Sequence, residues 1–165
     1  MRTLNRKSEK NNQNKTDPFI TEEKYHELKK TLEKLYKTRP KAAAEVSSLA
    51  EMGDFSENVE YQLAKGRLRG INNRILMLEQ QLNHAVIISP QKKTDSVRIG
   101  HHVRIETEGK KIDYLILGSA ESKPEKGIIS HLSPLGSALL GHKVGESVTL
   151  RLAEREMEYK ILKIE

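Results

Sequence analysis

The sequence places three carboxylates close together, directly after a single glycine. Asp54, Glu57 and Glu60 follow Gly53 in the segment MGDFSENVEY, and each lies three residues from the next. Acidic side chains at this spacing converge on one turn of a helix, where they can share a hard divalent cation such as magnesium. Two carboxylates alone make a weak magnesium site. Any chemistry at this point would therefore need further ligands from a partner.

The same carboxylates also have a purely structural explanation. Asp54 is a good N-cap residue, and Glu57 at the third helical position completes a capping box. All three acids lie near the positive end of a helix, which favours negative charge. Helix caps are far commoner than sites, so the spacing alone favours the cap.

Two long amphipathic stretches flank these acids and determine where they lie. Apolar residues recur three and four apart before Gly53, which supplies a typical helix end, and a heptad stripe follows it. Two helices of ~46 Å joined by a tight turn predict an antiparallel coiled-coil hairpin over residues 18–88, with its tip near 52–57. The acids then project at the far end of the hairpin. The stripe residues are Tyr25, Leu28, Leu32, Leu35, Ala42, Val46 and Leu49, then Tyr61, Ala64, Leu68, Ile71, Ile75, Leu78 and Leu82.

Helix-breaking residues interrupt both stretches. Pro40 disturbs the first helix, and Gly66 and Gly70 each cost the second about 1 kcal/mol relative to alanine. Counting back from the turn, we expect the proline to lie opposite the two glycines. We interpret the three residues as packing around one kink.

In the second half of the chain, the spacing between apolar residues changes. We interpret residues 89–96, SPQKKTDS, as a linker, and from Val97 to Ile105 apolar and polar residues alternate as in a strand. A small antiparallel sheet with one helix, over residues 97–165, is the economical arrangement. The predicted fold class is therefore an all-α hairpin followed by an α+β domain. Further strands are expected at 112–117, 127–132, 147–152 and 157–164, and a short helix at 134–140.

Composition narrows the classes of function. The 165 residues include no cysteine, which excludes disulfides and cysteine-ligated metals and fits a reducing cytoplasm. No stretch approaches the ~20 apolar residues of a membrane span, so we expect no membrane partner, and we expect a monomer. The net charge of +6 favours a polyanionic partner such as nucleic acid. Residues 1–17 are polar and predict a disordered tail, in which five basic residues either touch nucleic acid or are simply solvated: Arg2, Arg6, Lys7, Lys10 and Lys15.

Four basic residues follow the acids within one stretch of the second helix that contains no acid: Lys65, Arg67, Arg69 and Arg74. They form either an ordinary solvated face or a patch that attracts RNA phosphates in a salt-sensitive way. The histidines predict no metal site, because they are scattered and the adjacent His101 and His102 would face opposite sides of a strand.

The tip segment carries a family resemblance. GDFSENVEYQLAKGRLRGINNRI resembles the hairpin tip of the bacterial GreA/GreB-type transcript cleavage factors, whose signature is Gly-Asp, a variable pair, Glu-Asn, one residue, an acid and Tyr. RPKAAAEV and SPLGSALLGHKVGESVTL resemble further patterns of the family, and the similarity is collinear over residues 19–165. The signature is matched in register by Gly53, Asp54, Glu57, Asn58, Glu60 and Tyr61.

The resemblance implies a function. Such factors insert the hairpin into the secondary channel of a backtracked RNA polymerase, whose own active site then hydrolyses the 3′ end of the nascent RNA. Asp54 and Glu57 would be the catalytic acids that help to hold a magnesium ion shared with the polymerase, and no ion would bind stably to the factor alone. Glu60 would be an electrostatic neighbour, and Tyr61 would either pack in the hairpin or contact RNA. The protein would then be an accessory factor and not an enzyme by itself.

The resemblance also implies an FKBP-like C-terminal domain that docks on the polymerase around Ser133 and Pro134. We do not expect prolyl isomerase activity, because this half offers only Tyr114 and Tyr159 to line an aromatic pocket. Leu132 departs from the family, which usually carries Asp or Asn there. An apolar residue at this position would alter docking.

Two other functions compete with transcript cleavage. A channel binder that inhibits the polymerase without cleavage would not need both Asp54 and Glu57. A plain coiled-coil module that binds nucleic acid or a partner is supported by the basic residues, and it predicts that the tip acids are dispensable.

Overall fold

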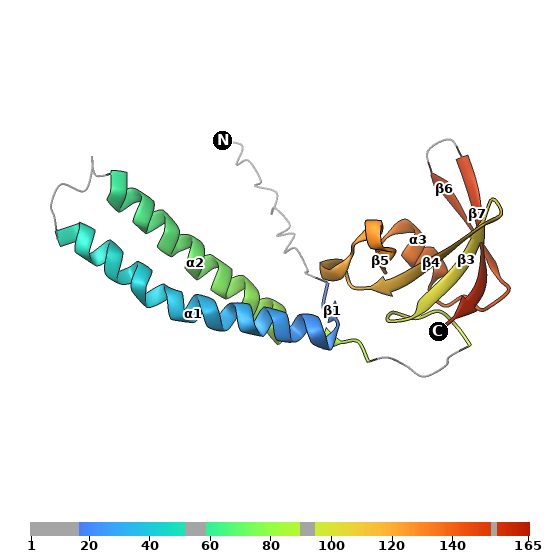
Figure 1. The fold of residues 1–165 in the computed structure, drawn as a ribbon, viewed down its shortest axis with the longest axis horizontal. Helices are drawn as coiled ribbons and strands as arrows, with labels where there is room; N and C mark the ends of the chain where they lie inside the picture. The colour runs from blue at the N-terminus through green and yellow to red at the C-terminus, as the bar shows by residue number, and fades with distance from the viewer. Residues whose placement is uncertain (1–16, 52–58, 90–94, 153–154) are drawn as a thin grey trace, which may run out of the picture.

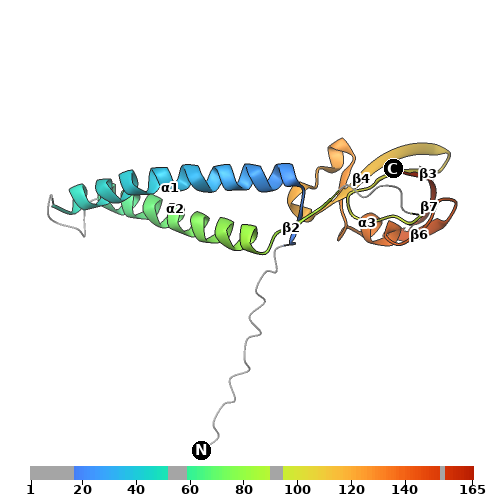
Figure 2. The same ribbon diagram turned by 90° about the horizontal axis from the view of Figure 1, so that it is seen from below.

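Two long helices and a curled sheet make up the structure, a computed structural model (Figures 1 and 2). Helices α1 (Glu22–Glu51) and α2 (Val59–Asn83) lie side by side as an antiparallel hairpin that extends away from the sheet. The predicted hairpin is therefore confirmed. No described helix is long and apolar enough to cross a membrane. The residues that the structure describes are 17–51, 59–89, 95–152 and 155–165.

The predicted apolar stripes form the contact between the two helices. Every stripe residue is partly or fully buried, and Ala64, Ile75 and Leu78 on α2 are the most deeply buried. Helix α1 has no fully buried residue, because a two-helix hairpin has only one apolar interface. Polar side chains also cross the interface: Arg67 Nη2 lies 2.7 Å from Glu45 Oε1, and the Tyr36 hydroxyl donates a hydrogen bond to Glu79.

The expected packing of glycines around a kink at Pro40 is wrong. An added Cβ at Gly66 or Gly70 would meet no atom of the described residues within 4 Å, apart from the neighbouring backbone of α2. Both glycines are exposed. The cross-helix contacts of Glu45 with Arg67 and of Tyr36 with Glu79 lie on either side of Pro40, so Gly66 is not opposite the proline.

A short parallel ladder, which the sequence did not predict, closes the base of the hairpin. Strand β1 (Phe19–Ile20) precedes α1, and strand β2 (Val86–Ile87) follows α2. The Val86 amide donates to the Pro18 carbonyl at 2.7 Å, and the Ile88 amide donates to the Ile20 carbonyl at 2.8 Å. Ile20 is fully buried. The ladder therefore holds together the two segments through which the chain enters and leaves the hairpin.

The C-terminal sheet has five strands in the order β5-β4-β3-β7-β6. We expected a purely antiparallel sheet, but β5 pairs parallel to β4. Two short 3-10 helices, η1 (Ser119–Glu121) and η2 (Pro124–Lys126), lie between these strands and replace the tight turn that antiparallel pairing would need. The strands are β3 (His102–Thr107), β4 (Lys110–Leu117), β5 (Ile128–Ser130), β6 (Ser147–Leu152) and β7 (Arg155–Ile164).

The strand predicted from Val97 begins only at His102. Val97 is nevertheless buried, and its amide donates to the His142 carbonyl at 2.8 Å. Gly100, with φ +96°, turns the chain before β3. His101 is buried and His102 is exposed, so the two rings do not converge.

Helix α3 (Pro134–Leu139) packs against β5 and β6 and buries Leu139 in the core of the sheet domain. Its close approach depends on Gly136, because a Cβ there would lie 2.1 Å from the Ser130 carbonyl oxygen. The position of Ser130 therefore fixes the start of α3.

The exposed glycines of α2 generate the first testable prediction. Gly66→Ala and Gly70→Ala should each raise the free energy of unfolding by up to about 1 kcal/mol, because alanine fits without a clash and has the higher helix propensity. Urea denaturation followed by circular dichroism measures the change.

Gly118→Ala is the matched control, because a Cβ at Gly118 would lie 1.8 Å from the Phe19 carbonyl oxygen. The same substitution should therefore destabilise the protein at this position. Destabilisation by either α2 substitution would mean that these glycines do pack closely.

Candidate functional site

The predicted catalytic acids belong to the segment that joins α1 to α2. Helix α1 ends at Glu51 and α2 begins at Val59, at the end of the hairpin remote from the sheet (Figure 1). Gly53, Asp54, Glu57 and Asn58 lie outside the described residues, and their roles stay predictions. Within the described ranges, no group of three or more histidine, aspartate or glutamate side chains could hold a metal ion.

The two remaining signature residues lie in the first turns of α2. Glu60 is exposed, and Tyr61 is partly buried on the stripe that faces α1. The Lys65 ammonium group lies 5.7 Å from the centre of the Tyr61 ring, a cation–π distance. Packing within the hairpin therefore accounts for the position of Tyr61.

The four basic residues of α2 do not form one patch. Successive residues of a helix are rotated by about 100°, so Lys65 and Arg69 lie on one flank of α2 while Arg67 and Arg74 lie on the opposite flank. Arg67 is already paired with Glu45 of α1. The face between the flanks carries exposed apolar side chains and the two glycines: Val59, Leu63, Gly66, Gly70 and Met77.

The predicted docking residues lie in a firmly held loop at the start of α3. We call residues 131–133 the docking loop. Its Ser133 hydroxyl donates to the Ser130 carbonyl at 2.6 Å and accepts from the Gly136 amide at 3.0 Å, which makes Ser133 the N-cap of α3. Pro134 occupies the first turn, where a proline is well tolerated. Leu132 is 64% exposed, and its amide donates to the Ser130 hydroxyl at 3.1 Å.

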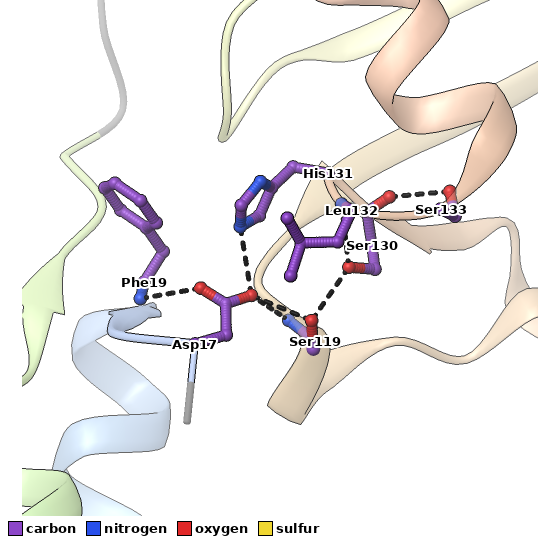
Figure 3. A network of polar contacts seen from close by, with 7 residues as sticks. All are labelled: Asp17, Phe19, Ser119, Ser130, His131, Leu132 and Ser133. Carbon is purple, nitrogen blue, oxygen red and sulfur yellow. Dashed lines mark hydrogen bonds and ion pairs between the residues drawn. The ribbon is translucent and has the colours of Figure 1, made fainter. Parts of the chain in front are cut away.

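A buried carboxylate connects this loop to the base of the hairpin (Figure 3). The side chain of Asp17 is only 4% exposed. Its Oδ1 accepts from the Phe19 amide at 3.1 Å. Its Oδ2 accepts from the Ser119 amide at 2.7 Å, from the Ser119 hydroxyl at 2.9 Å and from His131 Nε2 at 3.0 Å. Asp17 thus binds the segment before the hairpin to both η1 and the docking loop.

A second carboxylate also joins the two parts, but it belongs to the sheet domain and contacts the start of the hairpin. Glu121, in η1, accepts from the Thr21 amide at 2.7 Å and from the Thr21 hydroxyl at 2.6 Å. The Thr21 hydroxyl oxygen in turn accepts from the Lys24 amide at 3.1 Å and so caps α1. We call Asp17, Thr21, Ser119, Glu121 and His131 together the interdomain latch.

Hydrogen bonding keeps Asp17 charged despite its burial. Burial alone would raise the pKa of Asp17, but the hydrogen bonds from the Ser119 amide, His131, the Ser119 hydroxyl and the Phe19 amide outweigh it and hold the pKa below its ordinary value. The latch therefore contains an ionised carboxylate at neutral pH.

Sequence reasoning missed the latch. It assigned Asp17 to the disordered tail and treated His131 as one of several scattered histidines. The available signal was local: Asp17 and Pro18 directly precede the apolar residues Phe19 and Ile20.

Comparison with known proteins decides the family. The family model described as "Transcription elongation factor, N-terminal" matches residues 18–87, and the model "Transcription elongation factor, GreA/GreB, C-term" matches residues 91–165. The chain belongs to the GreA/GreB family of transcription elongation factors. The resemblance seen in the tip segment is therefore confirmed over both halves of the chain.

Two GreA relatives of this GreA/GreB family member agree with the assignment. Transcription elongation factor GreA of a Nitratiruptor species is 36% identical over 148 residues, which cover 88% of this chain and 91% of that protein. GreA of Caldanaerobacter subterraneus subsp. tengcongensis is 40% identical over 147 residues, covering 85% and 94%. Among solved structures, Thermus aquaticus Gfh1 aligns over 88% of this chain and 96% of its own, with 28% identity and a TM-score of 0.40.

The buried Asp17 generates a prediction about stability and pH. Asp17→Asn should lower the free energy of unfolding at neutral pH by about 1–3 kcal/mol, because buried donors lose a charged acceptor. The deficit should shrink below about pH 4. The pKa of Asp17 is lower in the folded protein than in the unfolded chain, so its contribution is present above the unfolded value and is lost as the pH falls through the folded one.

Urea denaturation across this pH range measures the effect. Asp113→Asn is the control, because Asp113 pairs with Arg104 on the surface of the sheet and both side chains are about half exposed. A deficit for Asp17→Asn that does not change with pH would contradict the charged state of the latch.

Proposed function

We propose that this GreA/GreB factor enters the secondary channel of RNA polymerase and stimulates the polymerase to hydrolyse the 3′ end of backtracked nascent RNA, which releases arrested complexes. The observation that carries the proposal is the family match over both halves of the chain, joined to a hairpin of the right form. Helix α1 has 30 residues, a length of about 45 Å at 1.5 Å per residue. Such a hairpin can reach an active site deep inside a large enzyme.

In this proposal the factor is an accessory protein that completes an active site in the polymerase. Asp54 and Glu57 would supply the missing carboxylates for a magnesium ion shared with the polymerase. The chemistry available at such a shared site is activation of the attacking water and stabilisation of the leaving oxygen. Hard oxygen ligands suit magnesium, which supports the assignment of these two residues.

Two surfaces of the described structure would help to bring the carboxylates into the polymerase active site. The Lys65 and Arg69 flank of α2 carries no cross-helix ion pair in the described structure, and we propose that it guides the RNA by attraction to its phosphates. Ser133 and Pro134 in and beside the docking loop would hold the polymerase at the rim of the channel, with the exposed Leu132 as an apolar contact. The exposed face of α2 between its flanks would then line the channel.

The tip acids are tested by transcript cleavage in backtracked elongation complexes with magnesium. Asp54→Ala and Glu57→Ala should each lower the stimulated rate about a hundredfold, because each removes a group that acts on the reacting centre. Binding to the polymerase should be unchanged. The readout is the shortening of RNA labelled upstream of the cleaved 3′ segment.

Glu60→Ala is the matched control, since it removes an exposed acid only three residues further along the chain than Glu57. It should leave the rate within about twofold of the unmodified protein. Cleavage by both tip variants at the normal rate would refute metal delivery and favour a nucleic-acid or partner-binding module. Slower elongation without cleavage by any version would favour a factor that only blocks the channel.

The basic flank has its own test. Lys65→Glu combined with Arg69→Glu should weaken stimulated cleavage more at about 0.1 M than at about 0.3 M salt, because salt screens the attraction to phosphate that the variant has lost. Thermal denaturation should show that the hairpin still folds. Arg74→Glu, on the opposite flank, should have the smaller effect, and equal losses from both flanks would contradict a one-sided path for the RNA.

A further inference from the structure

We propose that Asp17 is a positioning residue that fixes the direction of the hairpin relative to the docking loop. The inference rests on the proposed function, in which docking at one end of the molecule must aim the tip at the other end. Asp17 belongs to neither the docking loop nor the hairpin tip, and in this inference it determines how the two are placed relative to each other.

An unbroken series of hydrogen bonds joins the segment before the hairpin to the docking loop through Asp17 (Figure 3). From the Asp17 carboxylate the series passes to the Ser119 hydroxyl at 2.9 Å and from there to the Ser130 hydroxyl at 2.9 Å. Ser130 then receives the Leu132 amide through its hydroxyl and the Ser133 hydroxyl through its carbonyl. The exposed Leu132 is therefore connected to the base of the hairpin through Ser130 and Ser119.

The second carboxylate extends the connection to the hairpin itself. Glu121 binds both the amide and the hydroxyl of Thr21, the N-cap of α1. The cap of α1 is thus held by Glu121 of η1, and the cap of α3 is connected through Ser130 to Ser119 of the same 3-10 helix. Any rotation of the hairpin about its base would break the Glu121 contacts and the Asp17 contacts together.

The latch is what can resist such a rotation. The chain passes from the hairpin to the sheet domain only once, after β2, and one covalent connection leaves rotation free. Close backbone contact supports the latch, since Gly118 approaches the Phe19 carbonyl too closely to admit a Cβ. The Phe19 ring also meets the His131 ring edge-to-face, with centroids 5.4 Å apart.

Asp17 is the member of the latch that accepts the most hydrogen bonds in the described structure. It is the residue whose two oxygens contact the segment before the hairpin, η1 and the docking loop at once. Its removal leaves buried donors without an acceptor on both sides of the boundary, which favours separation of the two surfaces. Loss of a single hydroxyl, such as that of Ser119, leaves most of these contacts in place.

The direction of the hairpin can be measured directly because the chain has no cysteine. Lys37→Cys on α1 and Lys111→Cys on β4, both exposed, provide two unique sites for spin labels. Pulsed electron paramagnetic resonance should give a narrow distance distribution in the otherwise unmodified protein. Asp17→Ala should broaden it, whereas Asp113→Ala, which breaks an exposed ion pair within the sheet, should not.

Transcript cleavage then separates positioning from binding. At saturating factor, Asp17→Ala should lower the stimulated rate by about tenfold or more, because a small misplacement of reacting groups is costly. The affinity for the stalled polymerase should change by less than about twofold, since the docking loop remains. Asp17→Asn and Ser119→Ala, which keep part of the network, should fall between Asp17→Ala and the unmodified protein in both distance width and rate.

The outcomes are distinguishable. A narrow distance distribution together with normal cleavage in folded Asp17→Ala would overturn the inference, and so would a loss of rate fully explained by weaker binding. If Asp17→Ala fails to fold by circular dichroism, Ser119→Ala and Asp17→Asn carry the same test. If the unmodified protein stimulates no cleavage, the proposed function fails, while the spin-label distances still decide whether Asp17 fixes the hairpin.

Discussion

The burial of one carboxylate constrains how the two parts of this protein meet. A charge removed from water is tolerated only where polar groups replace the solvent, and Asp17 receives such groups from the segment before the hairpin, from η1 and from the docking loop. Two of these segments lie more than 100 residues from Asp17 in sequence, so together the donors favour an arrangement that brings the segments to the same carboxylate. The ionised side chain therefore specifies a geometry as well as contributing stability.

The hairpin needs this constraint because it cannot stabilise its own direction. Two helices share one interface, so α1 has no fully buried residue and α2 has only three. The polar pairs that cross the hairpin are exposed and hold the helices to each other, not to the sheet domain. The attachment of the hairpin to the sheet domain depends on the short ladder of β1 and β2, on the buried Ile20 and on the interdomain latch.

The sequence predicted those features that have a local pattern. The heptad stripe of α2, the boundaries of β6 and the start of α3 at Pro134 follow from spacing that a single element imposes on its own residues. The ladder between Phe19 and Val86, the parallel pairing of β5 and the contacts of Asp17 join distant residues and leave no periodic signal. The basic residues show the same limit. Lys65 and Arg67 are close in sequence, yet helical rotation places them on opposite flanks.

The tip acids represent the opposite case, in which the sequence predicts more than the described residues can test. One carboxylate can serve both as a helix cap and as a metal ligand. The amide donors at the start of a helix bind one of its oxygens, and the second oxygen stays free to bind a cation. In the proposed function the factor does not need to bind the ion tightly alone, because the polymerase supplies the other ligands. What it must supply is position. The buried polar contacts of the structure lie at the base of the hairpin. A small change in the angle of the hairpin at its base produces the largest displacement at the distant tip.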